Sequence, residues 1–195
     1  MILPMYIFGQ SVLRQETEEI SKDYPNLKEL IDNMFETMKL AEGVGLAAPQ
    51  IGLPIRMFVV DLDVLQDEFP QYKDFFRVYI NPEILEESEE TCVIEEGCLS
   101  IPGIHEGVRR ASSVHVKYYD ENFELHDEWL DNFAARVFQH EYDHLEGILF
   151  VDHVSSLRKQ LIKKKLIAMK KGQIRCDYKI KKNHGKTQDD VQTQH

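Results

Sequence analysis

The alternation of apolar and polar residues near the start of the chain predicts an amphipathic helix from about Asn26 to Ala41. Its apolar side chains recur at the i, i+3, i+4, i+7 spacing that places them on one helical face. Asn26 and Glu29 have the spacing of a capping pair, and Gly43 follows just beyond the end. We expect the core-facing positions to be Leu27, Leu30, Ile31, Met34, Phe35 and Met38.

Runs rich in β-branched and aromatic residues predict strands through the middle of the chain. We expect them at Ile55–Val60, Arg77–Ile80, Thr91–Gly97, Val114–Tyr119 and Phe123–Trp129, with shorter ones at Ile148–Val151 and Ile174–Ile180. The segment Asp61–Phe76 is long and acidic but carries four aromatic residues. We interpret it as a flap over a site, or as a surface excursion that its aromatic side chains pin down.

The stretch Gly43–Gly52, GVGLAAPQIG, is too rich in glycine, alanine and proline to predict a stable helix or a well-packed strand. Such small residues let the backbone approach a ligand closely, and Gln50 adds one amide to an apolar segment. The alternative is a plain tight loop between a helix and a strand.

A second helix is predicted from about Asp131, a plausible N-cap, to Gly147, and it contains the stretch QHEYDHLEG. His140 and His144 are four residues apart, so they share a helical face and can bind one cation together. Glu141 lies beside them, where a carboxylate can handle the proton of a metal-activated water.

The alternative interpretation of these histidines is a polar helix face exposed to solvent. However, Phe133 and Val137 precede them at helical spacing, which places the ionisable residues in line with an apolar stripe. Because ionisable groups that point into a core need partners, the pattern favours a metal site.

Composition and charge indicate a soluble globular protein with an uneven charge distribution. Of the 195 residues, 43% are hydrophobic and 29% charged. Residues 158–195 hold 12 Lys and Arg against 3 Asp and Glu, whereas residues 1–157 hold 11 against 31. An acidic body argues against a DNA-binding protein. A basic amphipathic helix is predicted at Ser155–Met169, and this end of the chain could contact phosphates or simply be solvated.

Three cysteines cannot form an even disulfide framework, and the opening MILPMYIF is too short for a signal peptide. No apolar run is long enough to span a bilayer, so we expect no membrane partner and a reducing, cytoplasmic location. Cys98 follows Gly97 and precedes Leu99, where its side chain and a neighbouring backbone N–H could both face a cavity. A core cysteine is the alternative.

Three stretches, GVGLAAPQ at 43–50, EGCLS at 96–100 and QHEYDHLEG at 139–147, together resemble the peptide deformylase family. These metal hydrolases remove the N-formyl group from nascent bacterial proteins. The resemblance implies an α+β fold, with antiparallel β-sheets packed around the central histidine helix, an N-terminal helix at one side and a C-terminal helical and extended segment outside. It further implies one catalytic domain over residues 1–182, with 158–182 as a basic extension and 183–195 as a polar, flexible tail.

By the same resemblance, Cys98, His140 and His144 bind one divalent ion, usually Fe(II) in this family and sometimes Zn(II) or Ni(II). Glu141 would take a proton from the attacking water and return it to the leaving amine. The resemblance assigns the side-chain amide of Gln50 and the backbone N–H of Leu99 to the formyl oxygen, and the backbone of Gly45 to the substrate.

The substrate implied by the resemblance is an N-formylmethionyl peptide, whose methionine needs an apolar slot. The matching positions for substrate contacts are Gly43, Val44, Phe133 and Val137, together with Tyr72 from the proposed flap. Arg136 stands where an apolar wall residue is expected, although an arginine stem can cover apolar surface. Glu96, Gln139 and Asp143 either orient the ligands or are surface polar residues.

Two other functions remain open from the sequence. A zinc endopeptidase would take a third ligand after the helix, such as Asp152 or His153, but would leave EGCLS and GVGLAAPQ unexplained. A non-catalytic protein with a structural zinc is the second. In addition, some deformylases dock on the ribosome through a C-terminal helix, and Arg158–Lys171 resembles such a helix in charge.

Overall fold

The computed structural model describes residues 1–183, and all but the first residue of the polar tail predicted at 183–195 lies outside them. The helices of this part are α1 (Leu27–Leu40), α2 (Asn132–Leu145) and α3 (Ser156–Lys170). None of these helices is long and apolar enough to cross a membrane.

The strands form one five-stranded sheet and two smaller pairs. The sheet is antiparallel in the order β2-β3-β4-β7-β8, β5 and β6 form an antiparallel ribbon, and β1 pairs in parallel with β9. The bounds are β1 Met5–Tyr6, β2 Gly45–Ala47, β3 Met57–Asp61, β4 Phe76–Glu87, β5 Thr91–Cys98, β6 Ile101–Ala111, β7 Ser113–Tyr119, β8 Leu125–Asp131 and β9 Ile180–Lys181.

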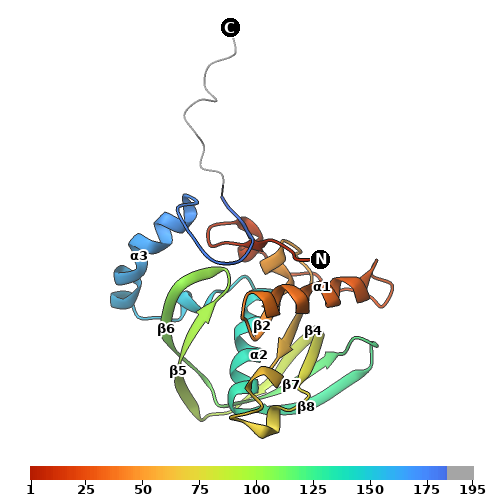
Figure 1. Cartoon of the computed structure of the whole chain (residues 1–195). Coiled ribbons are helices and arrows are strands. Elements are labelled where there is room, and N and C mark those ends of the chain that lie inside the picture. Colours follow the sequence, from red (N-terminus) through yellow and green to blue (C-terminus); the bar gives the residue numbers. More distant parts are fainter. Residues whose placement is uncertain (184–195) are drawn as a thin grey trace.

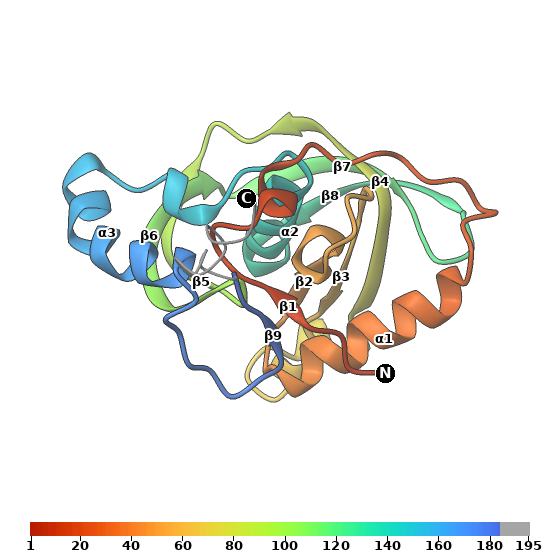
Figure 2. The same ribbon diagram turned by 90° about the horizontal axis from the view of Figure 1, so that it is seen from above.

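Helix α2 lies in the middle of the molecule, with the β5–β6 ribbon on one side and the sheet on the other (Figure 1). Phe138 on this helix packs edge-on against Phe58 and Tyr79 of the sheet, with ring centroids 5.2 and 4.9 Å apart. Helix α1 covers one side of the molecule and α3 lies at the opposite side (Figure 2). The expected α+β fold around the histidine helix is confirmed.

The apolar face of α1 packs on the core as predicted, but its predicted cap is wrong. Ile31, Met34 and Met38 are buried. Asn26 has φ 54° and makes no side-chain capping bond. A capping side chain reaches the first helical N–H groups from an extended backbone, which this left-handed residue does not have.

The segment GVGLAAPQIG is more regular than its composition predicts. It forms strand β2, where Gly45 pairs with Val60 of β3, followed by a 3-10 turn at Ala48–Ile51. This strand needs small side chains because α2 lies close against it. A Cβ on Gly45 would be 2.5 Å from Glu141 Oε1. The prediction that these residues form no strand is therefore wrong.

Two short strands were also predicted wrongly, and one long strand was missed. Residues 148–151 lead into a 3-10 turn at Phe150–Asp152, which the Asp152 carboxylate caps by accepting the Leu149 N–H at 2.9 Å. Residues 174–180 alternate between half-buried and exposed, but only the last has a partner strand, so the strand is confined to β9. Strand β6 was missed because its inward positions include Glu106 and Arg110.

The segment between β3 and β4 consists of two short 3-10 turns, Asp63–Leu65 and Pro70–Tyr72. Tyr72 is buried there, between the rings of Phe69 and Phe75 at centroid distances of 6.2 and 5.8 Å. Tyr72 and Phe75 also pack on the core between the sheet and α2, and Phe76 packs edge-on against Phe35 of α1 with ring centroids 6.5 Å apart, so these aromatic side chains hold the segment against the rest of the protein.

Candidate active site

A cavity of about 390 Å³ opens between strand β2, the end of the β5–β6 ribbon and one face of α2. It brings together residues that are far apart in the sequence. Those predicted for the site that line it are Gly43, Val44, Gly45, Gln50, Cys98, Leu99, Phe133, Val137, His140 and Glu141. His144 lies next to them as the third member of the metal-ligating group, whereas Tyr72 does not line the cavity.

Cys98, His140 and His144 form a group whose ligand atoms all lie within 4.8 Å of one another. The Cys98 Sγ is 3.4 Å from His144 Nε2. Burial and the neighbouring His140 hold the pKa of His144 well below its usual value, which leaves this imidazole neutral and able to bind a metal. Cys98, His140 and His144 would hold a divalent transition metal as one thiolate and two imidazole ligands, and the ion would supply Lewis-acid chemistry there.

Glu96 holds the first histidine in place. His140 Nδ1 donates to Glu96 Oε1 at 2.7 Å, which directs the other ring nitrogen away from this carboxylate. Arg110 donates to both oxygens of Glu96, at 2.7 and 3.0 Å, and to Asp143 at 2.7 Å. Burial alone would raise the pKa of Glu96, but the bonds from His140 and Arg110 lower it far below its usual value.

Arg136, where an apolar residue was expected, belongs to the same network. Its guanidinium donates to Glu96 Oε2 at 2.7 Å, to the Val108 carbonyl at 2.8 Å and to the Cys92 carbonyl at 2.8 Å. The residue is buried and also lines the cavity. Both terminal nitrogens of the guanidinium are thus bonded to the ribbon, whereas its Nε has no partner within residues 1–183, and the side chain still forms part of the cavity wall.

Gln50 is held in one orientation by its own turn. Its Oε1 accepts the Ala47 N–H at 2.8 Å, and its Nε2 donates to Ser100 Oγ at 3.2 Å and to Cys98 Sγ at 3.4 Å. The amide nitrogen therefore points toward the metal-ligating group. The neighbouring Leu99 N–H has no hydrogen-bond partner among residues 1–183, so it remains a free donor at the cavity.

Glu141 is buried beside the metal-ligating group, and its Oε2 has no partner within the described part of the chain. Burial raises the pKa of Glu141 to about 7, with His140 acting in the opposite direction. An unpaired buried carboxylate is costly to keep unless water or a substrate meets it. The residues present therefore fit a site that holds a metal ion and an activated water.

The side chains of Gln139 and Asp143 bond α2 to strand β6. The Gln139 side chain donates to the Ala111 carbonyl at 2.9 Å, and Asp143 bonds Arg110 and His153, the latter at 2.7 Å. His153 is thus engaged away from the metal-ligating group, as is Asp152, which forms an ion pair with Arg14. The third ligand that the endopeptidase interpretation needed is absent from this group in residues 1–183.

Several cavity residues were missed by the sequence analysis. Ile101, Pro102, Ile104 and His105 come from the unpredicted strand β6, and Tyr178 comes from the segment after α3. Arg110 was missed as the partner of Glu96. The alternating burial of β6 is broken in the sequence by charged residues, so hydrophobic patterning alone could not reveal it.

The comparisons with known proteins agree with this geometry. The sequence model of the family described as polypeptide deformylase matches residues 2–160. The chain belongs to the peptide deformylase family. A peptide deformylase of Christiangramia forsetii is 50% identical over 188 residues, covering 93% of this chain and 96% of the relative. One of Flavobacterium psychrophilum is also 50% identical, covering 93% and 97%.

Solved structures of peptide deformylases resemble the fold as well. The crystal structure from Thermotoga maritima is 43% identical with a TM-score of 0.72, covering 80% of this chain and 99% of that one. The structure from Legionella pneumophila is 36% identical with a TM-score of 0.78, covering 90% and 99%. As a peptide deformylase, the protein is a metal-dependent hydrolase that removes the N-formyl group from nascent chains.

Proposed function

We propose that deformylation takes place in this cavity, with Cys98, His140 and His144 holding the ion and Glu141 moving the proton. The observation that carries the assignment is the buried, unpartnered Glu141 carboxylate beside a group of three metal-ligating side chains. When bound, the ion supplies Lewis-acid chemistry, activating a water and polarising the formyl carbonyl.

The chain's own groups then bind and orient the substrate. The Gln50 amide and the free Leu99 N–H both belong to residues that line the cavity, and they would donate to the formyl oxygen as negative charge develops on it. The backbone of Gly45 would bind the peptide next to the formyl group, and the contact with Gly43 would lie just before the start of β2. Val44, Phe133 and Val137 would form the apolar slot for the methionine side chain.

Glu141 would accept a proton from the attacking water and deliver it to the leaving amine, so that formate and a free N-terminal methionine result. Its Oε2 is unpartnered within residues 1–183 and is available for this transfer, whereas Glu96 is fully engaged with His140, Arg110 and Arg136. The two buried carboxylates of the site therefore have different roles.

A direct assay compares formate release from a formyl-methionyl tripeptide with internal cleavage of an unblocked peptide by the same preparation. We expect formate release alone, because the cavity contains groups that recognise a formyl end. Glu141→Ala should abolish this release while metal content and the far-UV circular dichroism spectrum stay unchanged. Unfolding of this variant, or cleavage of internal peptide bonds, would contradict the assignment.

For the metal, we propose Fe(II) as the native ion, with Zn(II) or Ni(II) as functional replacements, because a thiolate and two imidazoles bind all three. Metal analysis of protein purified without oxygen, followed by formate-release assays after exchange of the ion, tests this. A preparation that contains only zinc and loses activity with iron would contradict Fe(II).

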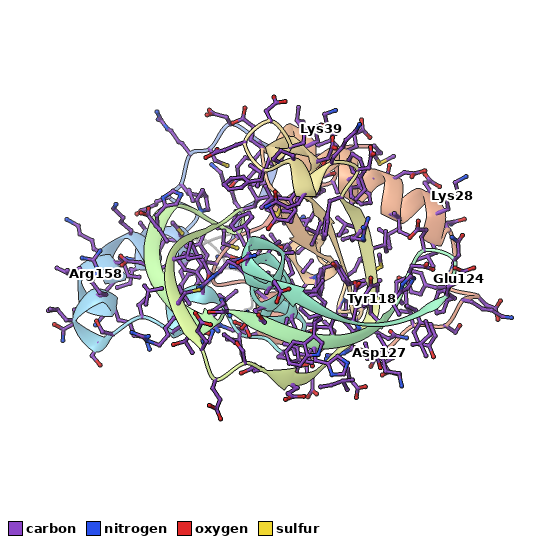
Figure 3. All side chains as sticks on the ribbon, turned by 90° about the horizontal axis from the view of Figure 1, so that it is seen from below. Lys28, Lys39, Tyr118, Glu124, Asp127 and Arg158 are labelled. Atoms are coloured by element: carbon purple, nitrogen blue, oxygen red, sulfur yellow. The ribbon has the colours of Figure 1, made fainter. Side chains whose placement is uncertain are left out.

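We also propose that the enzyme works in the cytoplasm and docks on the ribosome through α3. Its lysines are exposed, as is Leu161, and the helix lies at the edge of the molecule, where Arg158 is held to Glu106 of β6 by an ion pair (Figure 3). Contacts with RNA phosphates would make docking weaken with salt. Co-sedimentation with ribosomes at low and high salt, with and without residues 158–195, tests this; equal binding by both forms would reject it.

A further inference from the structure

The segment that follows α3, residues 172–183, crosses back over the molecule toward the active site. Gly172 has φ +71°, a left-handed conformation that turns the chain at the end of the helix. The segment then pairs with the N-terminus, where Met5 is opposite Ile180 and β1 and β9 lie side by side (Figure 2). It lies beyond the residues 2–160 that the family model matches.

Tyr178 is the residue by which this segment reaches the cavity. Its ring is half-buried against the core and lines the cavity wall. Its O–H donates to the Leu99 carbonyl at 2.6 Å. The segment therefore contacts the residue whose N–H is assigned to the formyl oxygen.

Leu99 and Ser100 form the tip of the hairpin between β5 and β6. The turn at this tip is not stabilised by its own backbone conformation alone. Cys98 pairs with Ile101, so only two residues make the turn. The turns that suit a two-residue hairpin need a positive φ at the first residue, and neither Leu99 nor Ser100 has one. The backbone of the tip thus depends on bonds from elsewhere.

Such bonds come from distant segments. The Ser100 carbonyl accepts the Phe8 N–H at 2.9 Å, and the Ser100 hydroxyl accepts from Gln50 at 3.2 Å. Both act on Ser100. Within residues 1–183, Tyr178 is the only residue that hydrogen-bonds the Leu99 backbone, and it does so directly beside the metal-ligating Cys98.

We propose that Tyr178 is a positioning residue for deformylation: its O–H fixes the Leu99 carbonyl and so keeps the Leu99 N–H facing the cavity. This inference rests on the proposed function, in which that N–H binds the formyl oxygen. A donor that rotates away from the developing charge loses most of its effect on the transition state.

The test uses Tyr178→Phe, which keeps the ring and removes the hydrogen bond. Tyr118→Phe is the matched control, because the Tyr118 O–H also makes one bond, to Glu128 at 2.8 Å. Tyr118 lies on the sheet, well away from the helix that carries Arg158 (Figure 3). We expect Tyr178→Phe to lower kcat about 5- to 10-fold with KM within about 2-fold, and Tyr118→Phe to change neither.

Amide hydrogen exchange measured by NMR gives a readout that does not depend on catalysis. Tyr178→Phe should exchange the Ile101 amide about 5- to 10-fold faster than the wild type, because the hairpin tip opens more readily, and Tyr118→Phe should not. Wild-type kcat or wild-type exchange in Tyr178→Phe would overturn the proposal. If the wild-type protein released no formate, the proposed function would fail and the role of Tyr178 in catalysis would fail with it, even if the exchange result showed that the tip is held.

Discussion

Glu96 shows how much of this site depends on residues that do not touch the substrate. Its two oxygens meet a histidine ligand and two guanidinium groups. In the sequence, the EGCLS motif indicated Glu96 as a site residue, and helical spacing indicated His140. The sequence analysis placed Arg136 at the pocket wall and did not identify either arginine as a partner of Glu96, because nothing local relates positions 110 and 136 to position 96. Only the folding of β6 beside α2 brings them together.

Arg136 should be important for stability. Replacing it by methionine keeps the apolar stem but removes one of the hydrogen-bond donors to Glu96. The Cys92 carbonyl loses the hydrogen bond from Arg136 as well. We expect a loss of about 3–5 kcal/mol in the free energy of unfolding, measured by urea denaturation. The control is Arg109→Met on β6, where the exposed side chain bonds only Thr91 within residues 1–183 and the change should stay within about 0.5 kcal/mol. Equal midpoints for the two variants would contradict this role.

Gly45 should tolerate no side chain, for a reason that concerns catalysis. An added Cβ would meet Glu141 Oε1 at 2.5 Å, so the carboxylate would have to move. We expect Gly45→Ala to lower kcat/KM about 100-fold, as a displacement of about 1 Å in a catalytic group does. Gly107→Ala in β6, where the nearest atom is the exposed Val93 side chain at 3.2 Å, is the control. Wild-type activity in Gly45→Ala would contradict the catalytic position assigned to Glu141.

Among the elements, the helices were predicted well and the irregular segments poorly. The histidine helix and α1 have long apolar stripes whose period is visible without tertiary context. Strands β2 and β6 were not predicted because neighbouring elements, and not their own side chains, decide their conformation. The end of the chain looked like a strand, and its alternating burial is real, but a strand extends only as far as its partner does.

The segment between β3 and β4 gives a test at this scale. Because Tyr72 is buried against Phe69 and Phe75 and does not line the cavity, Tyr72→Ala should cost about 3 kcal/mol in stability. KM for a formyl-methionyl peptide should stay within about 2-fold. Urea denaturation and steady-state kinetics on one preparation measure both. A raised KM without lost stability would place this segment over the substrate.

For the whole molecule, the metal site joins two separate parts. Cys98 ends a strand of the ribbon, whereas the histidines lie on the central helix, so an ion bound by all three ties the ribbon to the helix. The sequence indicated which residues would ligate the ion, but not that the site would connect these two parts.

Removing the ion should therefore lower Tm. An ion present at about 100 times its Kd adds about 2.7 kcal/mol, so chelation should lower Tm by about 5–10 °C, and the ion should restore it when added back. Glu141→Ala, which keeps all three ligands, should respond in the same way. Differential scanning calorimetry with and without chelator measures the shift. An unchanged Tm would mean that the three side chains do not hold the ion together.

The pairing of β1 with β9 has a consequence for synthesis. Met5 leaves the ribosome early, yet the strand it pairs with, at Ile180, is among the last residues of the described chain to emerge. Through most of translation β1 has no strand to pair with, and the tip of the β5–β6 hairpin lacks the hydrogen bond from Tyr178. Closing so long a loop is entropically costly and slow, so the active conformation is completed only after almost the whole polypeptide is free.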